Sequence, residues 1–290
     1  FILAIGGGSS IDTSKAIGII TNNPDFSDVV SLEGVAPTRK KSVPIIALPT
    51  TAGTAAEVTI NYVITDEENH KKMVCVDPND IVDAELMYTL PKGLTASTGL
   101  DALTHAIEGL ITKGAWEMSD MFEIKAIEMI ARYLETAVFE PTNAEARNGM
   151  AVAQYIAGMA FSNVGLGVVH GMAHPLGAIF DIPHGVANAL LLPVIMEFNA
   201  PAALSKYVDI AKAMNVYKDG MSREEAAKAA VEAVKALSVK VGIPQHLSEL
   251  GIKEEDLPRL AASAIADVCT PGNPREVTEE IILELYKKAF

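Results

Sequence analysis

Cysteine is scarce in this chain, and its scarcity argues against a disulfide-stabilised secreted domain. The 290 residues contain only Cys75 and Cys269, which lie far apart and form neither a C-x-x-C pair nor a disulfide framework. Isolated cysteines of this kind are typical of proteins in a reducing compartment. The sequence therefore predicts a cytoplasmic protein.

Positive charge is also in short supply. There are 23 lysines and arginines against 37 acidic residues, which gives a formal net charge of -14, and the longest basic run is Arg39-Lys40-Lys41. Nucleic acids and anionic membranes would repel such a chain. We expect a small-molecule partner, and neither a nucleic acid nor a membrane.

Long apolar runs are missing as well. The longest, VANALLLPVIMEF, is interrupted by Asn188 and Pro193, and it is shorter than the roughly 20 residues that a membrane span needs. The apolar start FILAI is followed by GGG and not by a signal-peptide cleavage pattern. The sequence predicts no spanning or targeting segment.

Apolar surface for folding is plentiful, since 49% of the residues are hydrophobic. A chain of this length can bury one large core or two smaller ones. Up to about residue 93, strand-like runs alternate with turns and one helical pattern: FILAI, IDTSKAIGII, SVPIIALPT, NYVIT and KKMVCV. From residue 94 onward, long segments with helical period dominate. The pattern predicts an α/β part followed by a helical part.

Two turns follow predicted strands and offer groups that bind phosphate. In GGGSS, free backbone N–H groups at a helix start attract phosphate oxygens, and Ser9 or Ser10 could cap the helix or donate a hydroxyl. This turn matches neither G-x-G-x-x-G nor the P-loop, so a purely structural turn is an alternative. TTAGTAAE places three hydroxyls after the next strand, on Thr50, Thr51 and Thr54. Together the turns predict a phosphate-bearing cofactor.

Histidines are few, yet three of the six gather in VVHGMAHPLGAIFDIPHG. His170 and His174 are four residues apart and share a helical face, and His184 follows Pro183 at a helix start. Asp101 and His105 form a second pair with the same spacing. A buried histidine bonded to a backbone carbonyl is the plain alternative for each residue alone. Taken together, the pairs predict a mixed oxygen and nitrogen site for Fe²⁺, Zn²⁺, Mn²⁺ or Co²⁺.

The quoted motifs resemble those of the iron-containing (group III) alcohol dehydrogenases. The similarity covers essentially the whole chain and runs through GGGSSIDTSKAIG, PTTAGTAAEVT, GLDALTHAIEG and HGMAHPLGAIFDIPHGVANALLLP. It implies an incomplete α/β dinucleotide-binding domain at residues 1–93. It also implies an all-α, dehydroquinate synthase-like metal-binding catalytic domain at residues 94–290. The active site would lie in the cleft between them, and the protein would be a homodimer.

The resemblance also implies roles for particular residues. The metal ligands would be Asp101, His105, His170 and His184. His174 would be catalytic and lie near the nicotinamide without binding the metal. The pyrophosphate site would be Gly6, Gly7, Gly8 and Ser9, and the residues around the nicotinamide ribose and phosphates would be Thr50, Thr51, Thr54 and Lys72. The substrate pocket would include Asn61, Phe161 and Cys269.

The implied activity is hydride transfer between NAD(H) and a small alcohol or aldehyde, with Fe²⁺ or alternatively Zn²⁺. Segments such as EGLITKGAWEMSD and DVCTPGNPRE are most similar to family members that interconvert lactaldehyde and 1,2-propanediol. We expect the metal to coordinate the alcohol oxygen and lower its pKa. His174 would pass the proton toward solvent or orient the nicotinamide.

Other functions and two departures from the family pattern stay open. The alternatives are a zinc-dependent polyol dehydrogenase of the glycerol or 1,3-propanediol type, a lyase resembling dehydroquinate synthase, and a non-catalytic truncated metal-binding module. The family has about ninety further residues before the glycine turn, including βα units and an acidic residue that helps select NAD over NADP. VDPNDIVDAEL is also about five residues shorter than the family pattern between Asp80 and Ile81. We therefore expect these 290 residues alone to bind nucleotide poorly.

Overall fold

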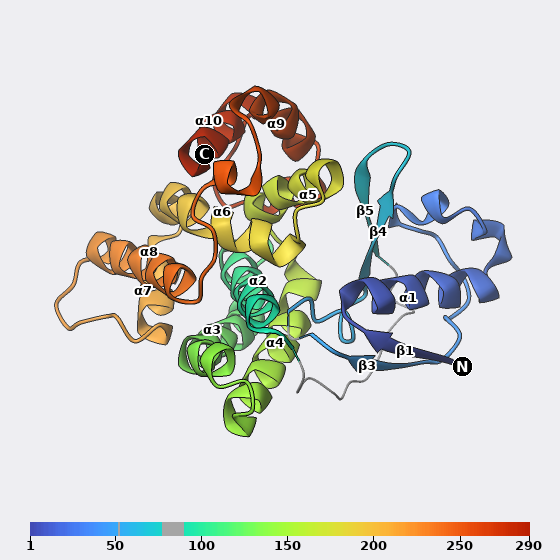
Figure 1. Cartoon of the computed structure of the whole chain (residues 1–290), viewed down its shortest axis with the longest axis horizontal. Helices are drawn as coiled ribbons and strands as arrows, with labels where there is room; N and C mark the ends of the chain where they lie inside the picture. Colours follow the sequence, from blue (N-terminus) through green and yellow to red (C-terminus); the bar gives the residue numbers. More distant parts are fainter. Residues whose placement is uncertain (52, 77–89) are drawn as a thin grey trace.

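The computed structural model describes residues 1–51, 53–76 and 90–290. Figure 1 shows an α/β part built from the first 76 residues beside a larger part built from helices. The expected order, an α/β part and then a helical part, is confirmed. The expected shortening between Asp80 and Ile81 lies outside the described residues.

The α/β part contains two small sheets. Its strands are β1 (Ile2–Gly6), β2 (Gly34–Val35), β3 (Ile45–Pro49), β4 (Asn61–Asp66) and β5 (Lys71–Val76). β1 pairs in parallel with β3, with Ala4 opposite Ala47. β5 lies between β2 and β4 and forms a hairpin with β4. Leu3 and Ile5 are more than half exposed, so β1 buries mainly its other face, through Ala4.

Helix α1 (Gly8–Asn22) follows β1 directly and covers one face of the β1–β3 sheet through the buried Ile11. It begins at Gly8, with Gly7 as its N-cap residue and no side-chain cap. Ser9 and Ser10 therefore lie inside the first turn, and the predicted serine cap is wrong. Short 3-10 helices follow: η1 (Pro24–Phe26) and η2 (Val29–Leu32).

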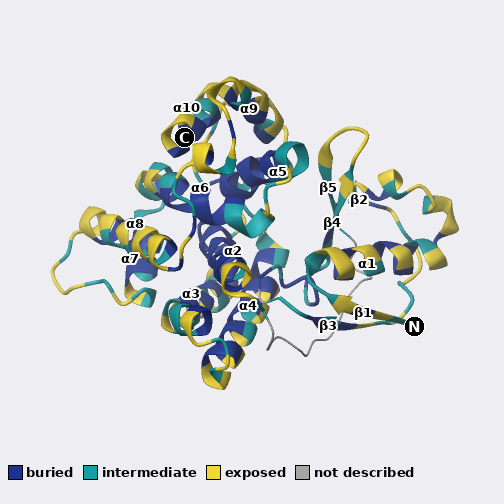
Figure 2. Ribbon diagram, in the orientation of Figure 1, coloured by how far each residue is buried: buried dark blue, intermediate teal, exposed yellow. Residues whose placement is uncertain are grey.

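The helical part is organised around α2 (Lys92–Ile111), of whose 20 residues 16 are buried. It contacts α3 (Glu117–Phe139), α4 (Ala144–Val164) and α6 (His184–Asn199). The remaining helices are α5 (Val168–Phe180), η3 (Ala200–Ala202), α7 (Leu204–Ala213), α8 (Arg223–Lys240), η4 (Leu247–Leu250), η5 (Glu254–Asp256), α9 (Leu257–Ile265), η6 (Thr270–Gly272) and α10 (Glu279–Ala289). Figure 2 shows the buried residues concentrated on α2, α5 and α6. A polar side chain on α2 is therefore buried and needs a partner.

The hydrophobic residues form separate clusters in the two parts. The largest cluster contains only residues from Ala96 onward. Two smaller clusters contain residues between Ala4 and Cys75. The free energy of apolar burial in each part therefore comes mostly from contacts within that part.

The segment between β3 and β4 joins the α/β part to α4. The Gln154 side-chain amide donates to Glu57 Oε1 over 2.5 Å, and the Ile60 N–H donates to Ser162 Oγ over 3.2 Å. Both contacts bridge residues about one hundred positions apart in the chain. They hold the threonine turn at a fixed place beside the helical part.

Among the described residues, one helical stretch is long and apolar enough to cross a membrane by length and composition. It spans His184–Ala202, and 56% of its most apolar window is buried within the structure. The bent pair α4 and α5 is long and apolar enough only if both helices count as one broken span. The burial of His184–Ala202 is that of a core helix, because it packs on α2, α5 and α8.

Candidate metal centre

Helix α2 places Asp101 and His105 one turn apart on the face that looks toward α5 and α6. Both side chains are buried, with 1% and 5% exposure of the residue. Asp101 Oδ2 lies 4.0 Å from His105 Nδ1. The i, i+4 spacing that predicts a shared face is therefore realised on this helix.

Helices α5 and α6 bring the other histidines to the same point. His170 lies in the first turn of α5, and His184 is the first residue of α6. His170 Nε2 lies 3.0 Å from His105 Nε2, and His184 Nε2 lies 3.5 Å from Asp101 Oδ1. One ligand atom from each of the four residues lies within 4.8 Å of all the others.

The connection between α5 and α6 makes this convergence possible. Asp181 ends α5 in the left-handed conformation, at φ 57°. Ile182 and Pro183 follow, and α6 then begins at once. A reversal this short keeps the start of α6 next to α5, so His184 lies beside His170. Their ring centroids are 5.4 Å apart.

The donor chemistry of this group fits a divalent cation. Burial lowers the pKa of His105 and holds that of His170 well below its usual value, and it lowers the pKa of His184 to about 4. The rings are therefore neutral at pH 7 and can offer lone pairs. His105 Nδ1 has no hydrogen-bond partner among the described residues. One carboxylate and three imidazoles suit Fe²⁺, Zn²⁺ or Co²⁺, and the group contains no thiolate.

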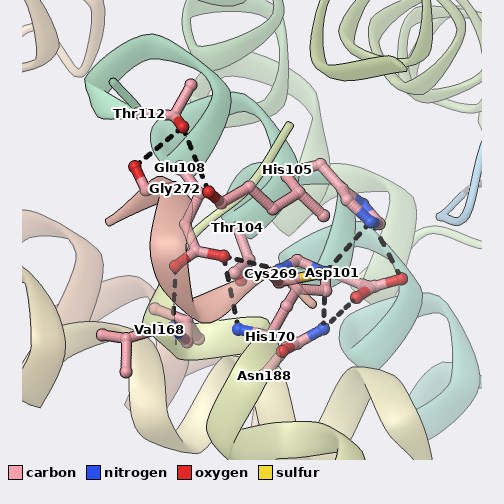
Figure 3. A network of polar contacts seen from close by, with 12 residues as sticks. Asp101, Thr104, His105, Glu108, Thr112, Val168, His170, Asn188, Cys269 and Gly272 are labelled. Carbon is pink, nitrogen blue, oxygen red and sulfur yellow. Dashed lines mark hydrogen bonds and ion pairs between the residues drawn. The ribbon is translucent and has the colours of Figure 1, made fainter. Parts of the chain in front are cut away.

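Two further buried residues contact the group and were not identified from the sequence. Glu108 Oε2 lies 2.6 Å from His170 Nδ1. Asn188 Nδ2 donates to Asp101 Oδ1 over 2.7 Å and lies 3.1 Å from His170 Nε2 (Figure 3). The same nitrogen lies 3.0 Å from His184 Nε2. The spacing was a usable signal, because Glu108 lies seven residues after Asp101 and Asn188 four after His184.

His174 lies one turn after His170 and belongs to a different group. Its Nδ1 atom lies 2.7 Å from Asp267 Oδ2, and its ring stacks on that of His184 at a centroid distance of 5.5 Å. Asp267 also accepts a hydrogen bond from the Cys269 N–H over 2.8 Å. Asp267 therefore links His174 to Cys269, and nothing in the sequence near either residue indicated that link.

The glycine turn and the threonine turn pack directly against each other. The Thr50 N–H donates to the Gly6 carbonyl over 2.8 Å. A Cβ atom on Gly7 would lie 3.1 Å from Thr51 Cγ2, and one on Gly8 would lie 2.9 Å from Thr54 Cγ2. The turns approach this closely because the glycines carry no side chain. The start of α1 and the threonine hydroxyls thus form one surface.

One cavity joins this surface to the three candidate ligand histidines, His105, His170 and His184. Its walls come from both parts of the chain, and the predicted site residues that line it are Gly8, Ser9, Thr54, Asn61, Lys72, His105, Phe161, His170, His174, His184 and Cys269. The predicted residues that do not line it are Gly6, Gly7, Thr50, Thr51 and Asp101. The first four belong to the two packed turns.

Lys72 is the one lysine or arginine among the described residues that line this cavity. Burial lowers its pKa, while the charges of Asp12 and Asp181 act in the opposite direction. A Cβ atom on Gly177 of α5 would lie 3.0 Å from Lys72 Cε, so the side chain reaches from β5 to the helical part. On the opposite wall, the Phe161 ring stacks on His105 with centroids 4.2 Å apart.

Comparison with known proteins gives consistent matches over both parts. Residues 1–87 match the sequence model described as iron-containing alcohol dehydrogenase. Residues 95–290 match the C-terminal model of the same family. The chain is 61% identical to lactaldehyde reductase of Escherichia coli strain K12 over 295 residues, which cover 100% of this chain and 77% of that protein. It is 45% identical to 1,3-propanediol dehydrogenase of Citrobacter freundii, again over 100% of this chain and 76% of that protein.

A solved structure shows the same arrangement. The crystal structure of a 1,3-propanediol oxidoreductase superposes on this chain with a TM-score of 0.96 at 43% sequence identity. The superposition covers 100% of this chain and 76% of that one. Agreement at this level extends to the placement of the α/β part against the helical part.

Proposed function

The chain belongs to the iron-containing alcohol dehydrogenase family, and on that basis we propose that it interconverts lactaldehyde and 1,2-propanediol with NADH and NAD⁺. Membership makes it a metal-dependent oxidoreductase of alcohols and aldehydes. The choice of substrate is supported by the 61% identity to a lactaldehyde reductase.

The observation that carries the proposal is the convergence of four donor groups within 4.8 Å of one another, three of them at the wall of one cavity. We propose that Asp101, His105, His170 and His184 hold Fe²⁺, with Zn²⁺ as the alternative ion. Support comes from the 3.0 Å approach of His105 Nε2 to His170 Nε2. Two neutral ring nitrogens that close, deep in the structure, are favoured by a cation between them. When bound, the ion acts as a Lewis acid toward a carbonyl or hydroxyl oxygen, and the nicotinamide exchanges the hydride.

The glycine turn and the threonine turn suit the nucleotide, and Gly8, Ser9, Thr54 and Lys72 line the cavity there. We propose that the pyrophosphate binds at Gly6, Gly7, Gly8 and Ser9, where the N-terminus of α1 offers backbone N–H groups. Thr50, Thr51, Thr54 and Lys72 would contact the ribose and phosphates. The contact of Gly8 with Thr54 supports this grouping. Lys72 adds a positive charge that attracts phosphate oxygens.

His174 is the group placed to hold or move a proton. Its Nδ1 atom faces the Asp267 carboxylate at 2.7 Å. A carboxylate accepts hydrogen bonds, so Nδ1 is the donor in this contact, and in the Nδ1–H tautomer of imidazole the lone pair is on Nε2. The side chain also lines the cavity. We propose that Nε2 takes the proton released on alcohol oxidation, or orients the nicotinamide.

The substrate end of the cavity favours small molecules. Asn61, Phe161 and Cys269 line it, and Phe161 is 4% exposed. Asn61 supplies an amide that can hydrogen-bond a second hydroxyl, such as the one that lactaldehyde carries next to its carbonyl. Phe161 limits the length of the substrate because its ring is fixed by stacking on His105.

The test is an NADH-linked assay on iron-reconstituted protein with lactaldehyde and a series of simple aldehydes of increasing length. We expect the highest kcat/KM with lactaldehyde, and reversal with 1,2-propanediol and NAD⁺. A highest kcat/KM with an aldehyde that lacks the second hydroxyl would contradict the substrate assignment. A complete absence of NADH oxidation, with metal bound, would favour the lyase.

A second candidate substrate is the aldehyde of 1,3-propanediol. The 45% identity to a 1,3-propanediol dehydrogenase and the TM-score of 0.96 to a 1,3-propanediol oxidoreductase favour it. The two candidates differ in whether the second hydroxyl is one or two carbons from the carbonyl. 3-Hydroxypropionaldehyde in the same assay separates them directly.

Domain division, assembly and location complete the proposal. We propose that residues 1–93 and 94–290 form two domains, which is supported by their separate hydrophobic clusters. We also propose a homodimer, because the resemblance to the family implies one, and a cytoplasmic location, because Cys75 and Cys269 are both free thiols. Light scattering after size exclusion would measure the assembly.

A further inference from the structure

Glu108 is a buried carboxylate beside the candidate metal centre that has no part in the proposed reaction. It lies on α2 one turn after His105, on the helix face that also carries Asp101. Only 1% of the residue is exposed. A carboxylate buried this deeply is tolerated only where several donors face it.

The donors that face Glu108 all belong to the start of α5. Its Oε1 atom accepts the Val169 N–H over 2.7 Å, and Oε2 accepts the His170 N–H over 3.3 Å. Helix α5 has Gly167 as its N-cap residue and no side-chain cap of its own. The Glu108 carboxylate therefore caps α5 from another helix, where the positive end of the helix dipole favours a negative charge.

The same carboxylate also sets the ring of His170. Oε2 lies 2.6 Å from His170 Nδ1 (Figure 3). Both oxygens accept hydrogen bonds, so Nδ1 is the donor and carries the ring proton. The lone pair is then on Nε2, the atom that lies 3.0 Å from His105 Nε2.

The backbone at Gly167 lies close to the Glu108 carboxylate. A Cβ atom at position 167 would lie 2.8 Å from Glu108 Oε1. Any side chain there would push the carboxylate away from the helix start. The chain thus leaves room for Glu108 at the one place where α2 meets the N-terminus of α5.

We propose that Glu108 is a positioning residue for the metal centre, which fixes the tautomer and rotation of His170 by capping α5. Glu108 does not itself touch the metal. This inference rests on the proposed ligand set. Replacing a carboxylate that holds a ligand histidine in this way typically weakens metal binding about 10- to 100-fold.

Glu108→Gln separates this role from that of a plain helix cap. Glutamine has nearly the same shape, and its Oε1 can still accept a backbone N–H of α5. Its amide nitrogen, however, can only donate toward His170 Nδ1. That contact would move the ring proton to Nε2 and block the ligand atom. The cap is kept, and the tautomer is reversed.

The experiment measures Co²⁺ binding to the metal-free protein by calorimetry and by the visible Co²⁺ absorption bands. We expect Glu108→Gln to weaken Co²⁺ binding by about 10- to 100-fold. Glu123→Gln is the matched control, because Glu123 is also buried next to α2 and its carboxylate oxygens have no hydrogen-bond partner among the described residues. It should bind Co²⁺ like the unchanged protein. Equal affinity for Glu108→Gln would overturn the inference.

Two further arms keep the outcomes distinct. His184→Ala should lose the Co²⁺ bands, and if it retains them the proposed ligand set fails, together with the inference that rests on it. If His184→Ala loses the bands and Glu108→Gln binds Co²⁺ as tightly as the unchanged protein, only the inference fails. Should Glu108→Gln not fold, the ¹⁵N shifts of the His170 ring in the unchanged metal-free protein decide. We expect the Nδ1–H tautomer, and the Nε2–H tautomer would overturn the proposal.

Discussion

His174 and Asp267 lie 93 residues apart in the chain, and their side chains meet with His174 Nδ1 2.7 Å from Asp267 Oδ2. The contact joins α5 to the segment between α9 and η6. It also places a partly buried carboxylate behind the one histidine of the cavity that is not among the four candidate ligands. Asp267 therefore determines which nitrogen of His174 faces the cavity with a lone pair.

Asp267→Asn should lower kcat about as much as Asp267→Ala. The amide of the introduced asparagine would donate to His174 Nδ1 and reverse the tautomer, although its oxygen could still accept the Cys269 N–H. We expect kcat to fall about 100-fold in both variants, with metal content unchanged. Asp219→Asn, at an exposed position, is the control. If Asp267→Asn turned over like the unchanged protein, Asp267 would have only a packing role.

Gly8→Ala should weaken nucleotide binding. The added Cβ atom would lie 2.9 Å from Thr54 Cγ2, so the two turns must separate. We expect the KM for NADH to rise about tenfold, which corresponds to about 1.4 kcal/mol. Thr54→Ser in the same protein removes the clashing methyl group and should recover part of the loss. Gly93→Ala is the matched control, because nothing lies within 4 Å of its Cβ position.

Cys75 gives a prediction for alkaline pH. Burial raises the pKa of its thiol from 9.0 to about 12, so the folded state favours the neutral form. The thiol contributes stability that is fully present below pH 9 and is lost as the pH rises toward 12. Between about pH 9 and about pH 10, we expect the unchanged protein to lose about 1 kcal/mol more unfolding free energy than Cys75→Ala.

Urea unfolding at the two pH values measures this difference. Cys75→Ala also loses packing, which lowers its unfolding free energy by the same amount at both pH values. The change of unfolding free energy with pH is therefore independent of this loss. If the unfolding free energies of the two proteins changed equally with pH, the Cys75 thiol would have the same pKa in the folded and unfolded states.

Local features of the site could be predicted from the sequence, because they depend on backbone geometry alone. Asp101 and His105 share a face at a spacing of four residues, and strand, glycine turn and helix follow one another from Ile2 to Asn22. Likewise, His184 begins a helix after Pro183. In each case the relevant distance is set within one or two turns of a single element.

The supporting residues could not be predicted in this way. Glu108 meets His170 across 62 positions, and Asp267 meets His174 across 93. Each contact depends on which faces of α2, α5 and the segment after α9 pack together, and helical period alone does not specify this. The predicted serine cap is wrong because the N-cap residue is Gly7, two residues before Ser9 and three before Ser10.

The most direct test of the proposed centre is the position of the metal in crystals of the Fe²⁺-loaded protein, located by anomalous scattering at the iron absorption edge. We predict one strong peak per chain, within about 2.2 Å of a carboxylate oxygen of Asp101 and of a ring nitrogen of each of His105, His170 and His184. The peak should be absent in His184→Ala, which removes one ligand. A peak at His174, Asp267 and Cys269 instead, or one that persists in His184→Ala, would contradict the proposed centre.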